Sequence, residues 1–132
     1  SHTILAGFTG LAGHAVVEDY AVLGGYVGIH QFVRVGESVM CAANAMVSKD
    51  CPPFALIAGD RARLAGVNVV GLRRRQFSPE ATRSIRQAFH VLFFSKLRFE
   101  VALARVRQEA GGSPEVERLV AFLEKSERGI TR

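Results

Sequence analysis

The sequence predicts a left-handed parallel β-helix of about 2.5 coils, followed by a small domain of three helices. Two observations support this prediction: a six-residue repeat in the first part of the chain, and helical periodicity with helix start signals in the last part. The predicted division places a hexapeptide-repeat region at residues 1–53, a connector at residues 54–77 and a helical domain at residues 78–132.

The repeat becomes visible when the chain is written in sixes from Leu5. The hexads are LAGFTG, LAGHAV, VEDYAV, LGGYVG, IHQFVR, VGESVM, CAANAM and VSKDCP. Their first position is aliphatic except at Cys41, and their fifth position is always small or β-branched. Neither the strand period of two nor the helix period of 3.6 gives six, whereas a short strand and a tight turn do. Three hexads then form one coil of a triangular prism, with the first-position side chains along its axis.

Two histidines occupy outward positions of this prism. His14 is fourth in the second hexad, and His30 is second in the fifth hexad. Because the two hexads are three apart, they stack on the same face of the prism in successive coils. Neighbouring strands lie about 4.8 Å apart, so one ligand could contact both histidines. The alternative is that they decorate a polar face, since outward positions tolerate almost any residue.

The repeat is expected to stop at Asp50-Cys51-Pro52-Pro53. Tandem prolines remove donors from the strand ladder and fix the backbone. The connector that follows contains Gly59, Gly66 and Gly71 and the basic run at residues 73–75.

Three helices are predicted after the connector. Ser78 is placed as the N-cap of the first, with Pro79 at its first position. The second extends over about Phe99 to Ala110, before two glycines, and the third starts at Ser113.

The composition is that of a soluble globular domain: the 132-residue chain is 48% hydrophobic and 22% charged. No apolar run approaches the roughly 18 residues that span a bilayer, and no charged leader precedes an apolar segment, so we expect a cytoplasmic protein without stable membrane insertion. Cys41 and Cys51 lack CxxC spacing and a nearby histidine pair, so we expect buried small side chains and no metal.

Charge is unevenly distributed along the chain. Residues 1–59 contain two basic and four acidic side chains, and residues 60–132 contain 15 basic and eight acidic ones, so their net charges are −2 and +7. The second part favours an anionic partner. No nucleic acid is expected, because the chain has no nucleic-acid-binding motif and its basic residues are not interleaved with aromatic ones.

Five motifs carry a family resemblance: LAGH, GGYVGIHQF, DCPPF, GVNVVGLRRRQFS and SERGITR, in this order and spacing. Together they resemble the C-terminal half of the bacterial UDP-N-acetylglucosamine O-acyltransferase that starts lipid A biosynthesis. The resemblance implies a homotrimer with active sites between neighbouring subunits. It also implies UDP-N-acetylglucosamine as acceptor and an acyl carrier protein thioester as co-substrate, with no cofactor.

The resemblance also implies roles for residues of the repeat. The peptide N–H of Gly13 would stabilise the thioester oxyanion, and His14 would line the cleft beside the reacting sugar hydroxyl. Acyl transfer to an alcohol needs both a base and an oxyanion donor. His30 and Gln31 would contact the nucleotide sugar in the next layer, and Ala43 lies where the family sets acyl-chain length.

In the connector, the resemblance implies that Asn68 binds the nucleotide and that Arg74 and Arg75 face the UDP group or the carrier. Guanidinium groups suit phosphate oxygens. Without the motif, the basic run would be read as a solvated segment before a helix. Two positions depart from the family pattern: Arg61 replaces a histidine, and Val70 stands where an acidic residue is common.

The family's general base, a histidine followed by an acidic residue, would lie upstream of the first residue of this chain. His2 does not match that position. We therefore expect a fragment that is inactive alone, belonging to an acyltransferase that moves a 3-hydroxyacyl chain to the 3-hydroxyl of UDP-N-acetylglucosamine. The alternatives are a noncatalytic module for trimerisation and carrier binding, or another hexapeptide-repeat acyltransferase.

Overall fold

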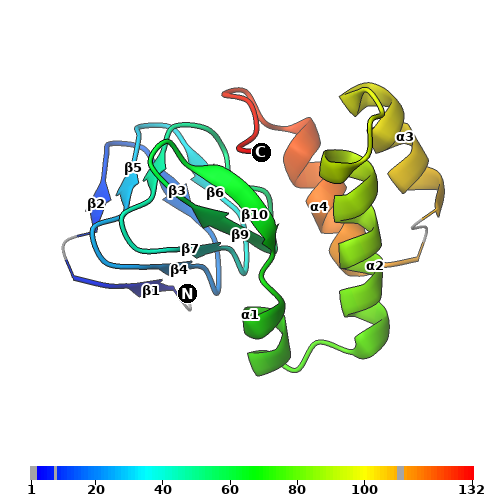
Figure 1. The fold of residues 1–132 in the computed structure, drawn as a ribbon, viewed down its shortest axis with the longest axis horizontal. Coiled ribbons are helices and arrows are strands. Elements are labelled where there is room, and N and C mark those ends of the chain that lie inside the picture. Colours follow the sequence, from blue (N-terminus) through cyan, green and yellow to red (C-terminus); the bar gives the residue numbers. More distant parts are fainter. Residues whose placement is uncertain (1–2, 8, 110–111) are drawn as a thin grey trace.

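The first part of the molecule is a triangular β-helix, and helices lie to one side of it (Figure 1). This computed structural model describes residues 3–7, 9–109 and 112–132. His2 and Ala110, named in the predictions above, lie outside the described residues. The strands of the prism are β1 (Ile4–Leu5), β2 (Gly10–Leu11), β3 (Val16–Val17), β4 (Val22–Leu23), β5 (Gly28–Ile29), β6 (Arg34–Val35), β7 (Met40–Cys41) and β8 (Met46–Val47).

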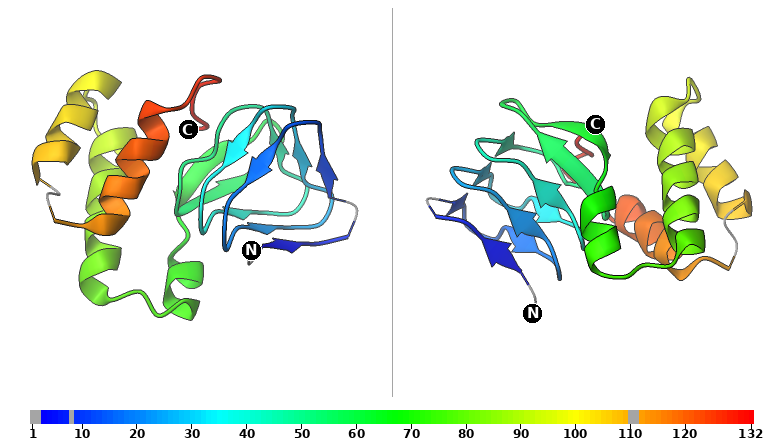
Figure 2. Two further views of the ribbon diagram at one scale, coloured as in Figure 1. Left: turned by 180° about the vertical axis from the view of Figure 1, so that it is seen from behind. Right: turned by 60° about the horizontal axis from the view of Figure 1, so that its bottom comes forward.

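Three parallel sheets form the faces of the prism. Their strand orders are β1-β4-β7, β2-β5-β8 and β3-β6, and partners such as Leu11 and Ile29 lie 18 residues apart, as three hexads per coil require. Figure 2 shows the triangular outline of the coils from behind. The predicted left-handed parallel β-helix is confirmed.

The prism axis is filled as the hexads predict. The first-position side chains Leu23 and Val35 and the fifth-position side chains Ala21 and Val33 are completely buried. Burial decreases toward the first coil, where Leu5 is 49% exposed. The hydrophobic core of the β-helix therefore lies in the second and third coils, with an apolar end face at the first.

The corners of the prism have a backbone conformation that repeats every six residues. In the second to seventh hexads the fourth-position residue has positive φ, between 56° and 68°, although none is glycine: His14, Tyr20, Tyr26, Phe32, Ser38 and Asn44. Such angles are uncommon for non-glycine residues, and here they close the turn at each corner. We name the corners after their first members: the His14 corner (residues 13–14 and 31–32), the Tyr20 corner (19–20 and 37–38) and the Tyr26 corner (25–26 and 43–44).

The third coil is two residues shorter than the other two, and the difference lies at its turn over residues 48–50. Val47 still pairs 18 residues from Ile29, but Cys51 bridges Val35 at a spacing of 16. The register therefore changes just before the tandem prolines. Parallel pairing nevertheless continues past them, because β9 (Ala55–Ala58) extends the sheet of β7 at the same spacing of 16.

The predicted connector contains regular structure. Strand β10 (Arg63–Val67) pairs with β9 as an antiparallel hairpin, and helix α1 (Val69–Arg74) follows it directly. Alternating burial along β9 indicates that one side of this hairpin joins the core.

The helical domain begins where the sequence predicts. Ser78 caps α2 (Pro79–Phe89) and Ser113 caps α4 (Pro114–Glu124), each accepting a backbone N–H of its first turn. A π-helical turn, η1 (His90–Phe94), extends α2, and α3 (Phe99–Glu109) follows. Helix α4 packs against both α2 and α3.

Helix α4 attaches the helical domain to the β-helix. The Arg118 guanidinium binds the Glu37 carboxylate at 2.5 Å, which raises the pKa of Arg118 above its usual value. The Arg34 guanidinium lies 4.2 Å from the centre of the Phe122 ring. These contacts cover the prism beside β6 and leave the face of β2, β5 and β8 outside this interface.

The last residues of the chain pair with the shortened turn of the third coil. Asp50, which is 1% exposed, donates its N–H to the Gly129 carbonyl and accepts the Thr131 N–H at its own carbonyl. Its carboxylate accepts the Arg34 N–H at 2.8 Å and the Ser126 hydroxyl at 2.7 Å. We call residues 126–131 the C-terminal tail.

The two cysteines are both completely buried. A hydrogen bond with Cys41, together with burial, raises the pKa of the Cys51 thiol well above its usual value. Because burial excludes the reagent from both thiols, and the raised pKa also keeps Cys51 out of its reactive thiolate form, we expect neither cysteine to react with a disulfide reagent in the native chain at about pH 8, where an ordinary thiol reacts readily. After unfolding in guanidinium chloride both thiols should react, which gives the reference value. A native thiol reacting at the rate of an unfolded one would contradict the buried placement.

Candidate functional site

Gly13 and His14 form one turn between β2 and β3. The Ala15 N–H donates to the Ala12 carbonyl at 3.2 Å, and His14 has the positive φ of 61° that such a turn requires at its third residue. The His14 ring stacks on Phe32 one coil further, with centroids 4.9 Å apart and planes 2° apart. The imidazole is exposed, as its outward position predicts, and the Phe32 ring orients it.

One of the two backbone polar groups of Gly13 forms a hydrogen bond. Its carbonyl accepts the Phe32 N–H at 3.3 Å, while its N–H has no hydrogen-bond partner among the residues that the structure describes. Among the described residues, no heavy atom beyond Gly13 and its two chain neighbours lies within 4 Å of where a Cβ would be. This N–H is consequently open to a ligand from outside, as the predicted oxyanion role requires.

His30 and Gln31 line a groove on the face of β2, β5 and β8. Its volume is about 520 Å³, and Arg128 of the C-terminal tail contributes to its wall. Both His30 and Gln31 are exposed, and they follow β5 as Ala12 and Gly13 follow β2. The other lining residues are Gly10, Leu11, Ala12, Gly28 and Ile29. The groove thus reaches the turn that holds Gly13.

Asn68 has a structural role that its sequence motif does not indicate. It is 8% exposed, its Nδ2 donates to the Ser38 carbonyl at 2.9 Å, and its Oδ1 accepts the Gly71 N–H as the N-cap of α1. A Cβ at Gly71 would lie 2.3 Å from Nδ2, so this close approach requires glycine. Asn68 ties α1 to the Tyr20 corner, and its predicted nucleotide contact stays a prediction.

The three arginine side chains of the basic run, residues 73–75, lie in different surroundings. The Arg75 guanidinium lies 3.1 Å from the centre of the Tyr20 ring and 5.6 Å from that of Phe77. Arg74 is exposed, and Arg73 points to a second groove. Cation–π contact orients Arg75 at the Tyr20 corner and leaves its N–H groups available.

The second groove lies between α1 and α2 and is basic. It has a volume of about 670 Å³, and its cations are Arg73, Arg83 and Arg86. The remaining lining residues are Val69, Phe77, Pro79, Thr82 and Gln87. An anionic protein surface fits such a wall better than a neutral ligand does.

The structure does not bring all the predicted residues together in one chain. Gly13, His14 and Gln31 belong to the His14 corner and His30 directly precedes it, whereas Asn68 and Arg75 contact the Tyr20 corner. A prism side of six residues at about 3.3 Å each separates two corners by roughly 20 Å.

Three further positions lie elsewhere in the fold. Ala43 is exposed at the Tyr26 corner, outside the residues that line the first groove. Arg61 lies in the turn of the β9–β10 hairpin, and Val70 is 59% exposed on α1. Their roles stay predictions.

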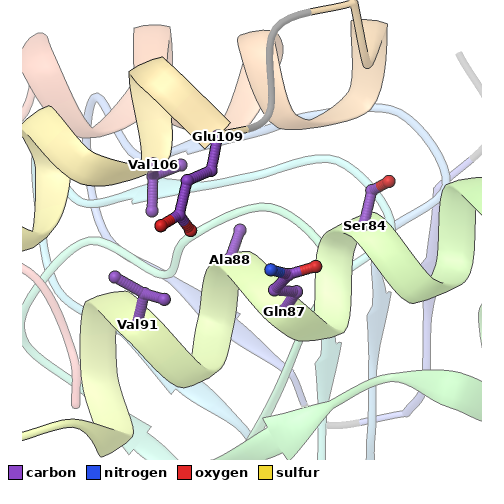
Figure 3. A pocket seen from close by; sticks show the side chains of 6 residues that line it. All are labelled: Ser84, Gln87, Ala88, Val91, Val106 and Glu109. Atoms are coloured by element: carbon purple, nitrogen blue, oxygen red, sulfur yellow. The ribbon is translucent and has the colours of Figure 1, made fainter.

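A small hollow between α2 and α3 carries no comparable chemistry. Figure 3 shows Glu109 pointing from α3 toward α2, beside Val106 and Ala88. The hollow measures about 40 Å³, far below the roughly 300–1,000 Å³ of ligand pockets. It is a packing defect between helices rather than a substrate site.

Within residues 3–7, 9–109 and 112–132, no group of three or more His, Cys, Asp or Glu side chains is placed to hold a metal ion. No helix in the same part of the chain is long and apolar enough to cross a membrane. Sequence reasoning did not assign Arg128 to this groove, and the available signal was its place in the SERGITR motif.

Comparison with known proteins agrees with the fold and the motifs. Residues 50–131 match the family model described as UDP N-acetylglucosamine O-acyltransferase, domain 2. The acyl-[acyl-carrier-protein]–UDP-N-acetylglucosamine O-acyltransferase of Burkholderia mallei is 43% identical over 136 aligned positions, which cover 100% of this chain and 52% of the relative.

Solved structures give the same result. UDP-N-acetylglucosamine acyltransferase of Francisella novicida superimposes with a TM-score of 0.95 at 36% identity, covering 100% of this chain and 49% of that one. The Arabidopsis enzyme superimposes with a TM-score of 0.93 at 34% identity, covering 98% and 49%. The fold is that of a hexapeptide-repeat acyltransferase. The chain belongs to the UDP-N-acetylglucosamine O-acyltransferase family and spans about half the length of the relatives it matches.

The Asn68 contacts give a test of the link between α1 and the β-helix. Asn68→Ala should lower the free energy of unfolding by about 1–3 kcal/mol, because it leaves a helix end and a buried carbonyl without partners. Urea unfolding measures the loss, and Ser78→Ala, which removes the cap of α2, is the matched control. If the two variants lose the same free energy, the bond to Ser38 contributes nothing.

Proposed function

We propose that this chain is part of an acyltransferase that moves a 3-hydroxyacyl group from acyl carrier protein to the 3-hydroxyl of UDP-N-acetylglucosamine, the first step of lipid A biosynthesis. Membership of the family carries the proposal. The relatives' names state both substrates; Gly13 and His14 lie on an exposed turn, and His30 and Gln31 line the adjoining groove.

The proposed reaction forms an ester and breaks a thioester. A base accepts the proton of the sugar 3-hydroxyl, the oxygen attacks the thioester carbon, and the carrier leaves as a thiolate that takes up the proton. The Gly13 N–H supports this scheme as an unengaged donor for the developing oxyanion. His14 supports it as an exposed imidazole held on Phe32, of the residue type that most often transfers protons in such reactions.

We further propose a homotrimer with acyl carrier protein as its protein partner. The separation of the His14 and Tyr20 corners supports the trimer, because a neighbouring subunit can supply the second wall of one cleft. The cations of the groove between α1 and α2 support the carrier assignment, because the carrier is acidic.

The proposed role of His14 can be tested in the longer protein that contains this chain. His14→Ala should reduce kcat at least tenfold with hydroxyacyl carrier protein and UDP-N-acetylglucosamine, because it removes a polar group beside the reacting hydroxyl. Light scattering should show an unchanged trimer. His14→Asn keeps a residue that tolerates positive φ and should be equally impaired. An active Asn variant would mean that His14 only maintains the turn, and an inactive parent protein would contradict the proposed function.

The carrier assignment predicts a difference in salt sensitivity. Raising NaCl from about 50 to about 300 mM should increase the KM for the carrier more than the KM for UDP-N-acetylglucosamine, because long-range attraction between proteins is screened. The double substitution Arg83→Gln and Arg86→Gln should weaken this salt dependence, and Arg105→Gln on α3 is the control. Equal salt sensitivity of both KM values would contradict carrier binding at the basic groove.

A further inference from the structure

Arg128 is the lining residue of the first groove that carries a permanent positive charge. The groove floor has glycines at two levels, the exposed Gly10 and the half-buried Gly28 beside the Met46 side chain, and its polar side chains are His30 and Gln31. None of these groups is a permanent cation. An anionic ligand group in this groove therefore meets its counter-charge at Arg128.

The fold holds the Arg128 guanidinium in a defined orientation. Its Nε and Nη2 atoms donate to the Ser48 carbonyl at 3.4 and 3.3 Å. Ser48 follows β8 as His30 follows β5, so the guanidinium lies about one coil beyond His30. A guanidinium has five N–H donors, and two of them are engaged here, which leaves the others for a ligand.

The position of Arg128 depends on the hydrogen bonds of the C-terminal tail. Here the Asp50 backbone pairs with Gly129 and Thr131, its carboxylate accepts the Ser126 hydroxyl, and the Thr131 hydroxyl donates to the Lys49 carbonyl. These bonds flank Arg128 on both sides in the sequence. A preorganised guanidinium loses little conformational entropy when it binds, which is the condition for a strong anion site.

We propose that Arg128 binds a phosphate group of a substrate in the groove beside His30 and Gln31. The proposal rests on the proposed function, which offers two sources of this chemistry: the pyrophosphate of the nucleotide sugar and the phosphodiester of the carrier's pantetheine arm. A planar guanidinium presents paired N–H groups to either one. The C-terminal tail is then part of the binding site as well as a structural attachment.

Steady-state kinetics of the full-length protein separate the two sources. Arg128→Gln should raise the KM for one substrate by roughly tenfold, the loss expected for a hydrogen bond to a charged group, with the KM for the other substrate changed less than twofold. An effect on the UDP-N-acetylglucosamine KM assigns the pyrophosphate, and an effect on the carrier KM assigns the phosphodiester. Arg128→Lys keeps the positive charge but lacks the paired N–H groups, so its KM should lie between those of the unsubstituted protein and Arg128→Gln. Arg105→Gln, an exposed cation outside this groove, should leave both KM values unchanged.

A second measurement tests the anion site without turnover or substitution. Phenylglyoxal modification of the full-length protein, followed by mass spectrometry, should be slowed at Arg128 by UDP or by inorganic pyrophosphate, and not at Arg105. Unchanged KM values in Arg128→Gln together with no protection would overturn the proposal and leave Arg128 as a contact to Ser48 alone. Protection in a protein without acyl transfer would instead retain the anion site and reject the proposed function.

Discussion

The buried carboxylate of Asp50 is the contact on which both the shortened turn of the β-helix and the attachment of the C-terminal tail depend. In the regular coils, a backbone carbonyl accepts each ladder N–H; at the shortened third turn, the Asp50 side chain accepts the Arg34 N–H instead. The same carboxylate accepts the Ser126 hydroxyl, and the Asp50 backbone pairs with the tail. One residue thus completes the ladder and attaches the end of the helical domain. A buried carboxylate without such partners would be strongly destabilising.

The β-helix was predictable from sequence because its core repeats. Each coil presents the same two inward positions, so a pattern such as Leu23, Val35 and Val47 is visible without any tertiary information. The starts of α2 and α4 were predictable for a local reason, since Ser78 and Ser113 satisfy donors in their own first turns. The corner conformation also follows the repeat, although its positive φ at residues such as Phe32 has no glycine signal.

The rest depended on contacts that no local pattern encodes. The shortened turn is defined by the bridge between Cys51 and Val35, which no local pattern indicates. The β9–β10 hairpin forms because β7 offers an open sheet edge. The amide of Asn68 contacts Ser38, 30 residues away, so a residue predicted to bind the nucleotide also links two elements of the fold. For the candidate site, sequence could name the turn residues Gly13 and His14, but not which prism corner each of the other residues would occupy.

The distribution of these residues over two corners connects the fold to the proposed assembly. A single prism holds its corners about 20 Å apart, too far for one phosphate or sugar to contact His30 and Arg75 of the same chain. A closed ring brings different patches of neighbouring copies together, so two distant corners can become the two walls of one cleft. Arg128 lies on the His14 side of that division, beside His30, whereas the basic groove between α1 and α2 lies on the other. The cleft of the proposed trimer would then have a cation on each wall. This arrangement suits a substrate that carries more than one negative charge on its phosphate oxygens.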